Sequence, residues 1–524
     1  MYLCCPVSYL RHNLDSFVQA LKVLGINHVV VSPGSRNAPI VAGFLRIGGF
    51  NILSAPDERA AAFMALGAAQ ATGKPAVVLC TSGTAVLNLY PGICEAFYQR
   101  VPLIAITADR PENMIDQWDG QTIRQKDIFE KHILKGFHAE TNLHEKAAET
   151  ELLAMASESV SISMGKPRGP VHINIPLSEP IYEDLEKPVS TTWAKPAPVE
   201  AESHVEPNIP SALKQTSRIL FLAGQLPPDV NLKRSLQTIS ESYPVVADVL
   251  SNIQGETVIN GTENFASIAE HYRPDALVTL GLSVVSKSLK LLLRQLNIPL
   301  HYHLGDGGFT GDPFFTNPKT LNTPADVFLA QWLKSNTHYK DVEFYGAWHD
   351  AITETKGSDK EAELIKNLIQ RIPNNACLQL GNSMIVRHAN RCKTLPNFVF
   401  GNRGTSGIDG SVSTAMGFAW ARPDQQVYCL SGDIAFLYDK NAWWCNPMPA
   451  NISVVVINNG GGMIFDRLQG PEKMPGLRDF MHTPHHFTAQ YIATHYSIPY
   501  RSCNAKEIKN FTEIPSGIME IFTA

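Results

Sequence analysis

Short, continuous apolar runs alternate with longer amphipathic stretches along almost the whole sequence. Strands that are apolar at every position are typical of parallel sheets whose two faces are both covered by helices. The alternation therefore predicts an α/β fold of open, mostly parallel sheets flanked by helices. The predicted strands are residues 28–31, 52–54, 76–80, 103–107, 171–175, 219–222, 276–280, 376–380, 427–430, 452–457 and 518–522.

The first amphipathic stretch indicates where its helix begins and ends. Between residues 14 and 24, apolar side chains recur three or four positions apart, which is the spacing of one helix face. Asn13 is the expected amino-terminal cap of this helix. Gly25 is expected directly after its carboxyl end, where glycine accepts a left-handed backbone.

Two changes in composition divide the 524 residues. Residues 179–210 are rich in Pro, Glu, Ser and Ala without lasting periodicity, as in a linker, and a polar stretch covers residues 334–366. At about 150 residues per domain, a chain of this length is expected to hold about three domains. We therefore predict three α/β domains, at residues 1–190, 191–355 and 356–524.

Composition excludes several classes of protein. The formal net charge is −5, so no broad basic field is expected to bind nucleic acid or anionic lipid. The nine cysteines never occur as C-x-x-C, which argues against a disulfide framework or a cysteine zinc site and favours a reducing cytoplasm. The longest apolar runs are far shorter than the about 20 residues of a membrane-spanning helix.

Two predicted strands end in polar residues that suit a cation. Asp433 follows the strand at 427–430, and Asn459 follows the strand at 452–457. Ligands of open parallel sheets bind at the carboxyl ends of strands, and Mg²⁺ prefers oxygen donors together with ligand phosphates. Each turn alone is common in loops. The pair, 26 positions apart and each after a strand, predicts a metal and phosphate site.

This pair resembles the motif of thiamin-diphosphate-dependent enzymes, which begins Gly-Asp and ends Asn-Asn. The resemblance implies that Asp433, Asn459 and the carbonyl group of Gly461 bind the Mg²⁺ or Mn²⁺ ion that holds the diphosphate. The usual third glycine of the motif is Ile434 here, a departure seen in some branches of the superfamily.

Glu58 opens a predicted alanine-rich helix after the strand at 52–54. A carboxylate in the first turn of a helix is favoured by the helix dipole, which explains most such glutamates without a function. In thiamin enzymes, however, a glutamate at this place binds N1′ of the pyrimidine and acts as the acid/base. The turn at residues 81–84 matches a further landmark of the pyrimidine-binding domain.

Three further motifs resemble one family within this superfamily. They are Ser-Pro-Gly-Ser-Arg-Asn-Ala-Pro at 32–39, Ala-Asp-Arg-Pro at 108–111 and Asn-Arg-Gly-Thr-Ser-Gly-Ile-Asp-Gly at 402–410. The chain resembles the 2-succinyl-5-enolpyruvyl-6-hydroxy-3-cyclohexene-1-carboxylate (SEPHCHC) synthases of menaquinone biosynthesis, strongly in the first and third domains and weakly in the middle one. The resemblance implies a pyrimidine-binding domain, a middle domain and a diphosphate-binding domain, in that order. It also implies decarboxylation of 2-oxoglutarate and addition of the succinyl-semialdehyde carbanion equivalent to isochorismate.

The resemblance also implies which residues contact these anionic substrates. Arginine binds carboxylates bidentately, although a single arginine is more often a surface charge. The substrate-binding positions are Ser35, Arg36, Arg110, Gln121, Lys287, Ser383, Arg387, Arg403, Ile464, Phe465 and Leu468. Some relatives have a second basic residue next to Lys287, where this chain has Ser288.

Two residues of the 402–410 motif are assigned to the cofactor by the same resemblance. Ser406 would contact the cofactor, and Ile408 would be the wedge that holds it bent. The alternative for Ile408, as for Ile464 and Phe465, is ordinary core packing.

In thiamin enzymes of this architecture, the glutamate domain of one subunit faces the metal-binding domain of another. We therefore expect a homodimer or a dimer of dimers. Two alternatives are another thiamin-dependent 2-oxoacid decarboxylase or acetohydroxyacid synthase, and a non-catalytic relative. The arginine motifs argue against the first, and the presence of Glu58, Asp433 and Asn459 together argues against the second. Relatives usually continue into a helical tail, so this chain is expected to be naturally short or truncated.

Two groups of histidines have no role among the functional residues that the resemblance implies. His301 and His303 share one face of a strand, and His482, His485 and His486 are close in sequence. Neither group has a convincing third ligand, so all five are interpreted as ordinary histidines.

Overall fold

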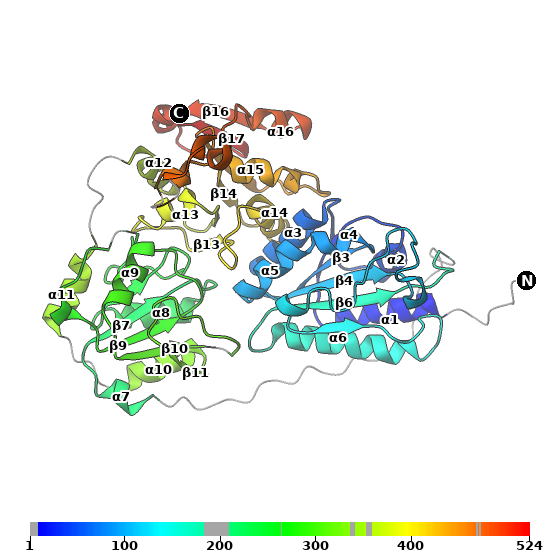
Figure 1. Cartoon of the computed structure of the whole chain (residues 1–524), viewed down its shortest axis with the longest axis horizontal. Helices are drawn as coiled ribbons and strands as arrows, with labels where there is room; N and C mark the ends of the chain where they lie inside the picture. Colours follow the sequence, from blue (N-terminus) through cyan, green and yellow to red (C-terminus); the bar gives the residue numbers. More distant parts are fainter. Residues whose placement is uncertain are drawn as a thin grey trace, which may run out of the picture. The chain divides into compact units, whose positions relative to one another are not determined.

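Three parallel sheets form the framework of the computed structural model (Figure 1). The structure describes residues 9–182, 209–263, 265–305, 307–335, 341–352, 359–467, 470 and 473–523. Every pair of neighbouring strands in these sheets is parallel, which confirms the predicted α/β class. Among the described residues, no helix has the length and apolar character needed to cross a bilayer.

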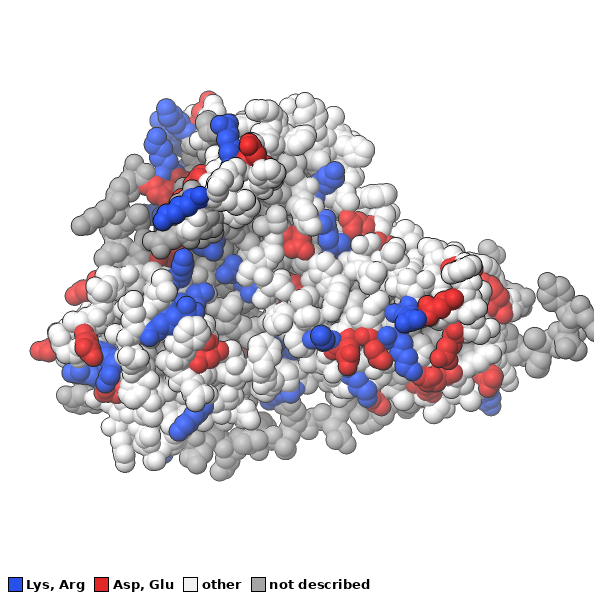
Figure 2. All heavy atoms as spheres, viewed as in Figure 1, with Lys and Arg blue, Asp and Glu red and all other residues white. Residues whose placement is uncertain are grey.

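The chain divides into two compact units. The first contains Met1–Glu202, Val412–Asp424 and Asp439–Ala450, and the second contains Ser203–Ser411, Gln425–Tyr438 and Asn451–Ala524. The predicted domain boundaries near 190 and 355 fall on residues outside the described ranges, so they stay predictions. On the face shown in Figure 2, basic and acidic side chains lie intermixed.

The first unit is built on a six-stranded sheet of order β2-β1-β3-β4-β6-β5. In Figure 1, α1 and α6 lie on one face of this sheet, and α3 and α5 lie on the other. The strands are β1 His28–Val31, β2 Asn51–Ser54, β3 Ala76–Cys80, β4 Leu103–Asp109, β5 Gly136–His138 and β6 Pro170–Pro176. The helices are α1 Leu10–Val23, α2 Ala38–Ile47, α3 Glu58–Thr72, α4 Thr84–Asn88, α5 Tyr90–Gln99 and α6 Ala148–Met164.

Helix α1 differs from the prediction at its amino end. It begins at Leu10, so Asn13 lies inside the helix and is not its cap, contrary to the prediction. The Asn13 side chain donates hydrogen bonds to the carbonyl groups of Leu143 (2.9 Å) and Glu145 (2.7 Å), so a tertiary contact uses the amide. At the other end, Gly25 follows the helix with φ +90°, as predicted.

A segment from the carboxyl-terminal part of the sequence belongs to the first unit. Helix α14, Ser411–Ala421, packs against α3 so closely that a Cβ atom at Gly67 would overlap the carbonyl oxygen of Thr414. A Cβ at Gly417 would likewise overlap the backbone of Met64. Both glycines are therefore needed for the backbones of the two helices to touch.

The second unit contains two sheets. One has five strands in the order β11-β10-β9-β7-β8, and the other has six in the order β13-β12-β14-β15-β17-β16. The strands are β7 Ile219–Ala223, β8 Val245–Ala247, β9 Ala276–Leu280, β10 Leu300–Leu304, β11 Lys319–Leu321, β12 Cys377–Leu380, β13 Phe398–Gly401, β14 Val427–Gly432, β15 Ile452–Asn458, β16 Tyr500–Asn504 and β17 Gly517–Phe522. The helices are α7 Ser211–Lys214, α8 Val230–Ile239, α9 Lys287–Gln295, α10 Ala325–Lys334, α11 Val342–Asp350, α12 Lys360–Ile369, α13 Met384–Ala389, α15 Asp433–Tyr438 and α16 Gln490–His495.

Short turns of helix complete both units. The 3₁₀ helices are η1 Glu112–Met114, η2 Glu130–His132, η3 Glu270–Tyr272, η4 Lys440–Trp443, η5 Met463–Arg467 and η8 Ala505–Asn510, and the π-helical turn is η7 Arg478–His482. The predicted strands are all present, several extended by one or two residues at their carboxyl ends. In open parallel sheets these carboxyl ends are where ligands bind.

Candidate active site

Glu58 is the first residue of α3, directly after the helix cap. The Asp57 carboxylate caps the helix, since its Oδ1 accepts the N–H groups of Arg59 (2.9 Å) and Ala60 (3.3 Å). Asn441 donates to the other oxygen of Asp57 at 2.8 Å. Glu58 itself is half-buried, and its Oε2 accepts a hydrogen bond from the side chain of Asn88 at 3.4 Å. Both oxygens of Asp57 are thus hydrogen-bonded, which fixes the position of the first turn of α3. The Glu58 carboxylate lies in this first turn, where the helix dipole favours an anion.

Arg36 and Arg110 lie in loops at the carboxyl ends of β1 and β4. Arg36 is only 5% exposed, and its Nη1 donates to the carbonyl of Leu177 (2.9 Å) and pairs with Glu179 Oε1 (3.0 Å). Leu177 in turn donates its N–H to the carbonyl of Asp109, the residue before Arg110. The Nε atoms of Arg36 and Arg110 are buried without a hydrogen-bond partner among the described residues. Two buried cationic N–H groups without a hydrogen-bond partner favour an anionic ligand at the carboxyl ends of β1 and β4.

The two polar residues predicted beside these arginines lie in the same loops. Ser35 is exposed, and its carbonyl accepts the Tyr182 hydroxyl at 3.3 Å. Gln121 has φ +55°, and its carbonyl accepts the Ser82 hydroxyl at 2.9 Å. Arg110 Nη2 donates to the carbonyl of Gly120 at 3.1 Å, so Arg110 and Gln121 are neighbours.

A buried hydrogen-bond network lies beneath Arg110, and sequence reasoning missed it. Asn174 donates to Asp109 Oδ2 (2.7 Å) and accepts from Gln125 (2.9 Å), whose side-chain oxygen accepts the N–H of Gly83 (2.9 Å). Burial raises the pKa of Asp109 to about 6, and burial lowers the pKa of His172, in the same network, to about 3. The network ties the turn at 81–84 to the loop of Arg110, and only the tertiary structure reveals it.

Asp433, Asn459 and Gly461 form one cluster in the second unit. Asp433 Oδ2 accepts the N–H groups of Asn459 (3.2 Å), Gly460 (2.9 Å) and Gly461 (3.1 Å). The other oxygen, Oδ1, accepts the N–H of Ile434 at 2.7 Å. Strands β14 and β15 pair with Gly432 beside Ile457, so their carboxyl ends share one edge. The three residues predicted to bind the metal are therefore brought together.

The donor set of this cluster fits a hard divalent cation. A carboxylate, the Asn459 side-chain oxygen and the Gly461 carbonyl are all oxygen donors, the type that Mg²⁺ and Mn²⁺ prefer. Burial raises the pKa of Asp433, while the hydrogen bonds that it accepts from the backbone N–H groups of Ile434, Gly461 and Gly460 oppose that rise. Within the described residues, no three His, Cys, Asp or Glu side chains form a metal site by themselves. A site here depends on the amide and carbonyl oxygens as well as on Asp433.

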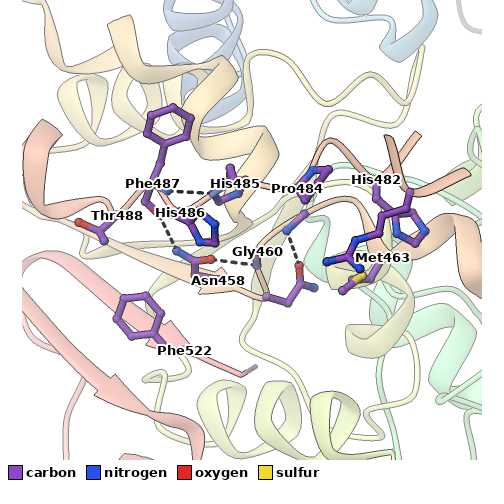
Figure 3. Close-up of a pocket in the computed structure, with 13 residues that line it drawn as sticks. Asn458, Gly460, Met463, His482, Pro484, His485, His486, Phe487, Thr488 and Phe522 are labelled. Atoms are coloured by element: carbon purple, nitrogen blue, oxygen red, sulfur yellow. Dashed lines mark hydrogen bonds between the residues drawn. The ribbon is translucent and has the colours of Figure 1, made fainter. Parts of the chain in front are cut away.

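A cavity of about 660 Å³ adjoins this cluster (Figure 3). Its lining includes residues 458–461, His482 and residues 484–488. Figure 3 shows the labelled side chains of Asn458 and His485 on facing segments of this cavity.

The predicted substrate residues of the second unit lie around the starts of α9 and α13. Ser383 precedes α13 with φ +67°, and its carbonyl accepts a hydrogen bond from Arg387 at 2.6 Å. Arg403 Nη1 donates to the side chain of Asn382 at 3.2 Å, and its carbonyl accepts the Ser283 hydroxyl at 3.1 Å. Exposed Lys287 is the first residue of α9, four positions after Ser283.

Ser288 has a structural role in this chain. Its hydroxyl donates to the carbonyl of Glu263 (2.6 Å) and accepts the N–H of Phe265 (3.1 Å). One turn further along α9, Lys290 has a pKa lowered by burial and then by the positive charge of Arg403, among other groups. Lys290 therefore adds a cation near Arg403 that sequence reasoning missed, although its spacing of three from Lys287 places both on one helix face.

The remaining predicted residues have mixed outcomes. Ser406 has φ +64°, and Ile408 is 39% exposed, so the alternative that Ile408 belongs to the core is wrong. Ile464 and Phe465 are half-buried in η5. Leu468 lies outside the described residues.

Comparisons with known proteins agree with this geometry. Residues 12–130 match the N-terminal TPP binding domain of thiamine pyrophosphate enzymes, and residues 380–510 match their C-terminal TPP binding domain. The solved 4-hydroxybenzoylformate decarboxylase of Rhodococcus jostii, thiamine diphosphate-dependent, is only 15% identical. It covers 98% of both chains with a TM-score of 0.69, which shows the shared fold.

Relatives with higher identity show the family. The chain is 35% identical to the SEPHCHC synthase of Desulfotalea psychrophila, over 95% of this chain and 94% of that protein. It is 37% identical to the synthase of Cytophaga hutchinsonii, over 91% and 89% of the two chains. It is 36% identical to that of Flavobacterium johnsoniae, over 97% and 95%. With its thiamin-binding domains and these full-length relatives, the chain belongs to the SEPHCHC synthase family of thiamin-diphosphate-dependent enzymes.

Proposed function

We propose that the protein decarboxylates 2-oxoglutarate and transfers the remaining four-carbon unit to isochorismate, giving SEPHCHC and CO₂ in menaquinone biosynthesis. The observation that carries this proposal is that the Nε atoms of Arg36 and Arg110 are both buried and have no hydrogen-bond partner among the described residues. A family enzyme with anionic substrates needs such groups, because a buried guanidinium binds a carboxylate through charge-assisted hydrogen bonds.

The metal and diphosphate are assigned to the Asp433 cluster. Asp433, Asn459 and the carbonyl of Gly461 would hold Mg²⁺ or Mn²⁺, and the metal would hold the diphosphate. When bound, thiamin diphosphate supplies the group that accepts the negative charge left by loss of CO₂. The half-buried Glu58 would share a proton with N1′ of the pyrimidine, the acid/base role for which a fixed carboxylate is suited. Ser406 and Ile408 contact the cofactor.

The substrate carboxylates are assigned to two sets of cationic and polar side chains. Ser35, Arg36, Arg110 and Gln121 form the set of the first unit, and Lys287, Lys290, Ser383, Arg387 and Arg403 form the set of the second. A carboxylate that binds Arg36 replaces Glu179, which holds the guanidinium at 3.0 Å with a side chain that is 58% exposed. The apolar side chains of Ile464 and Phe465 are assigned the role of excluding water beside the substrate.

Each active site is shared between two chains in this proposal. The cofactor has two ends, and the residues assigned to them, Glu58 and Asp433, belong to different units of the chain. A two-fold homodimer, alone or within a dimer of dimers, then has two equivalent sites, each with Glu58 from one chain and Asp433 from the other.

The experiment that tests the substrate assignment compares 2-oxoacids. CO₂ release is measured with thiamin diphosphate and Mg²⁺ for 2-oxoglutarate and for pyruvate, each with and without isochorismate. The proposal expects release from 2-oxoglutarate that rises when isochorismate is added, because isochorismate accepts the four-carbon unit. A preference for pyruvate would favour the acetohydroxyacid synthase or simple decarboxylase alternative.

A further inference from the structure

The loop between η7 and α16 presents one histidine to the Asp433 cluster. The side chain of His485 is only 6% exposed, and its Nε2 lies 3.2 Å from Asp433 Oδ2. Its backbone N–H donates to the carbonyl of Gly460 (3.1 Å), and Gly462 donates to the carbonyl of His482 (2.7 Å). These two bonds join the backbone at His482 and His485 to the glycines that follow Asn459, so the backbone of His485 is held next to the Asp433 cluster.

Contacts on the other side of the ring determine which nitrogen carries the proton. The N–H of Phe487 donates to His485 Nδ1 at 3.2 Å, as drawn in Figure 3, and the two rings stack with centroids 5.7 Å apart. Because the Nδ1 lone pair accepts this bond, the hydrogen-bond geometry assigns the ring N–H to Nε2. The ring therefore presents an N–H to the side of Asp433.

The Nε2–H group of His485 does not point directly at Asp433 Oδ2, the nearest oxygen. Although the two atoms are 3.2 Å apart, His485 Nε2 is buried without a well-formed hydrogen bond among the described residues. Asp433 Oδ2 meanwhile accepts three backbone N–H groups. A metal that draws a lone pair of Asp433 to itself must reorganise these contacts, and hydrogen bonds at functional sites often become well aligned only when the ligand is bound.

We propose that His485 is a positioning residue for the metal: its Nε2–H donates to Asp433 Oδ2 in the loaded site and orients the carboxylate toward the cation. The inference rests on the proposed metal site at Asp433, Asn459 and Gly461. Groups that orient a metal ligand typically change metal affinity by about 10–100-fold when removed. This role differs from the ordinary histidine that the sequence alone indicated.

Two variants separate the Nε2–H from the rest of the side chain. His485→Asn keeps an acceptor at the place of Nδ1 for the Phe487 N–H but has no donor at the place of Nε2. His485→Gln reaches the place of Nε2 with an amide N–H. His486→Phe is a matched control, since His486 lines the same cavity in the next position.

The readout is metal binding, not turnover. Mg²⁺ is titrated by calorimetry into each protein saturated with thiamin diphosphate, and the melting temperature without ligands reports the fold. We expect about 10–100-fold weaker Mg²⁺ binding for His485→Asn, with His485→Gln and His486→Phe within a few-fold of the parent.

The Asp433→Asn variant separates the proposed role of His485 from the proposed metal site itself. If Asp433→Asn weakens Mg²⁺ binding while His485→Asn does not, the role of His485 is wrong and the metal site stands. If His485→Asn and His485→Gln weaken binding equally, donation from Nε2 is not the cause and the inference is also overturned. If Asp433→Asn binds Mg²⁺ like the parent, the proposed metal site itself is wrong.

Discussion

Replacing Glu179 by Gln should improve binding of the anionic substrate that uses Arg36. In the structure, Glu179 Oε1 pairs with Arg36 Nη1 at 3.0 Å, so the carboxylate occupies a position that a substrate carboxylate needs. Gln keeps the size of the side chain and removes its charge. The substrate then displaces a weaker competitor.

The magnitude follows from the unequal burial of the two partners. Glu179 has 58% of its side chain exposed, and exposed ion pairs are typically worth about 0.2–1 kcal/mol, so KM should fall by roughly 1.4- to 5-fold. Arg36 has only 6% of its side chain exposed, and its charge-assisted contact with a substrate is worth about 1.5–3 kcal/mol. Arg36→Ala should therefore raise KM by roughly 10- to 150-fold.

The assay is steady-state kinetics with each substrate varied in turn at saturating cofactor. Glu158→Gln is the matched control, because Glu158 also forms an exposed ion pair in the first unit, with Lys135 at 2.6 Å. It removes the same charge away from Arg36 and should leave KM unchanged. A rise in KM for Glu179→Gln would refute the reasoning, because Glu179 would then hold Arg36 in its binding position instead of competing for it.

Four other results are expected. Glu58→Gln cannot shuttle the proton, so turnover should fall by ~10²-fold or more while cofactor affinity changes less, and near-normal turnover would remove its assigned role. Glu58→Gln and Asp433→Ala chains, mixed with exchange verified by mass, should recover roughly a quarter of parental activity, whereas sites built within one chain would give none. Lys290→Met should raise the KM of an anionic substrate and leave thiamin diphosphate affinity unchanged; an unchanged KM for both substrates would exclude Lys290 from the site. Burial lowers the pKa of His172 to about 3 from 6.5, so the unfolded chain takes up the proton first and stability is lost as pH falls from 6.5 toward 3. His172→Gln should flatten that part of the pH dependence in hydrogen exchange of the β6 amides, and an equal slope in parent and variant would contradict the assignment.

The sequence was sufficient where local pattern and parallel-sheet geometry act together. Apolar runs located β14 and β15, and the rule that parallel strands end at a common edge placed Asp433 beside Asn459. The 3.2 Å hydrogen bond between them confirms that proximity. Their binding of a metal stays a prediction.

Prediction from the sequence was wrong or incomplete where a side chain or helix makes its contacts with a distant part of the chain. Asn13 has the properties of a helix cap, but its hydrogen bonds to Leu143 and Glu145 override that local preference. Helix α14 packs on α3 through Gly417, and nothing in its own sequence indicates this partner. His485 was similarly hidden, because its relation to Asp433 depends on how two loops close over one another.

The most direct test of the central claim is identification of the product by mass spectrometry. The purified protein is incubated with 2-oxoglutarate and isochorismate, with thiamin diphosphate and Mg²⁺ either present or omitted, alongside the Glu58→Gln variant. The account predicts SEPHCHC and one CO₂ per product only in the complete parental reaction. Cofactor-loaded parental protein that consumes neither substrate, or that releases only succinic semialdehyde in the presence of isochorismate, would contradict it.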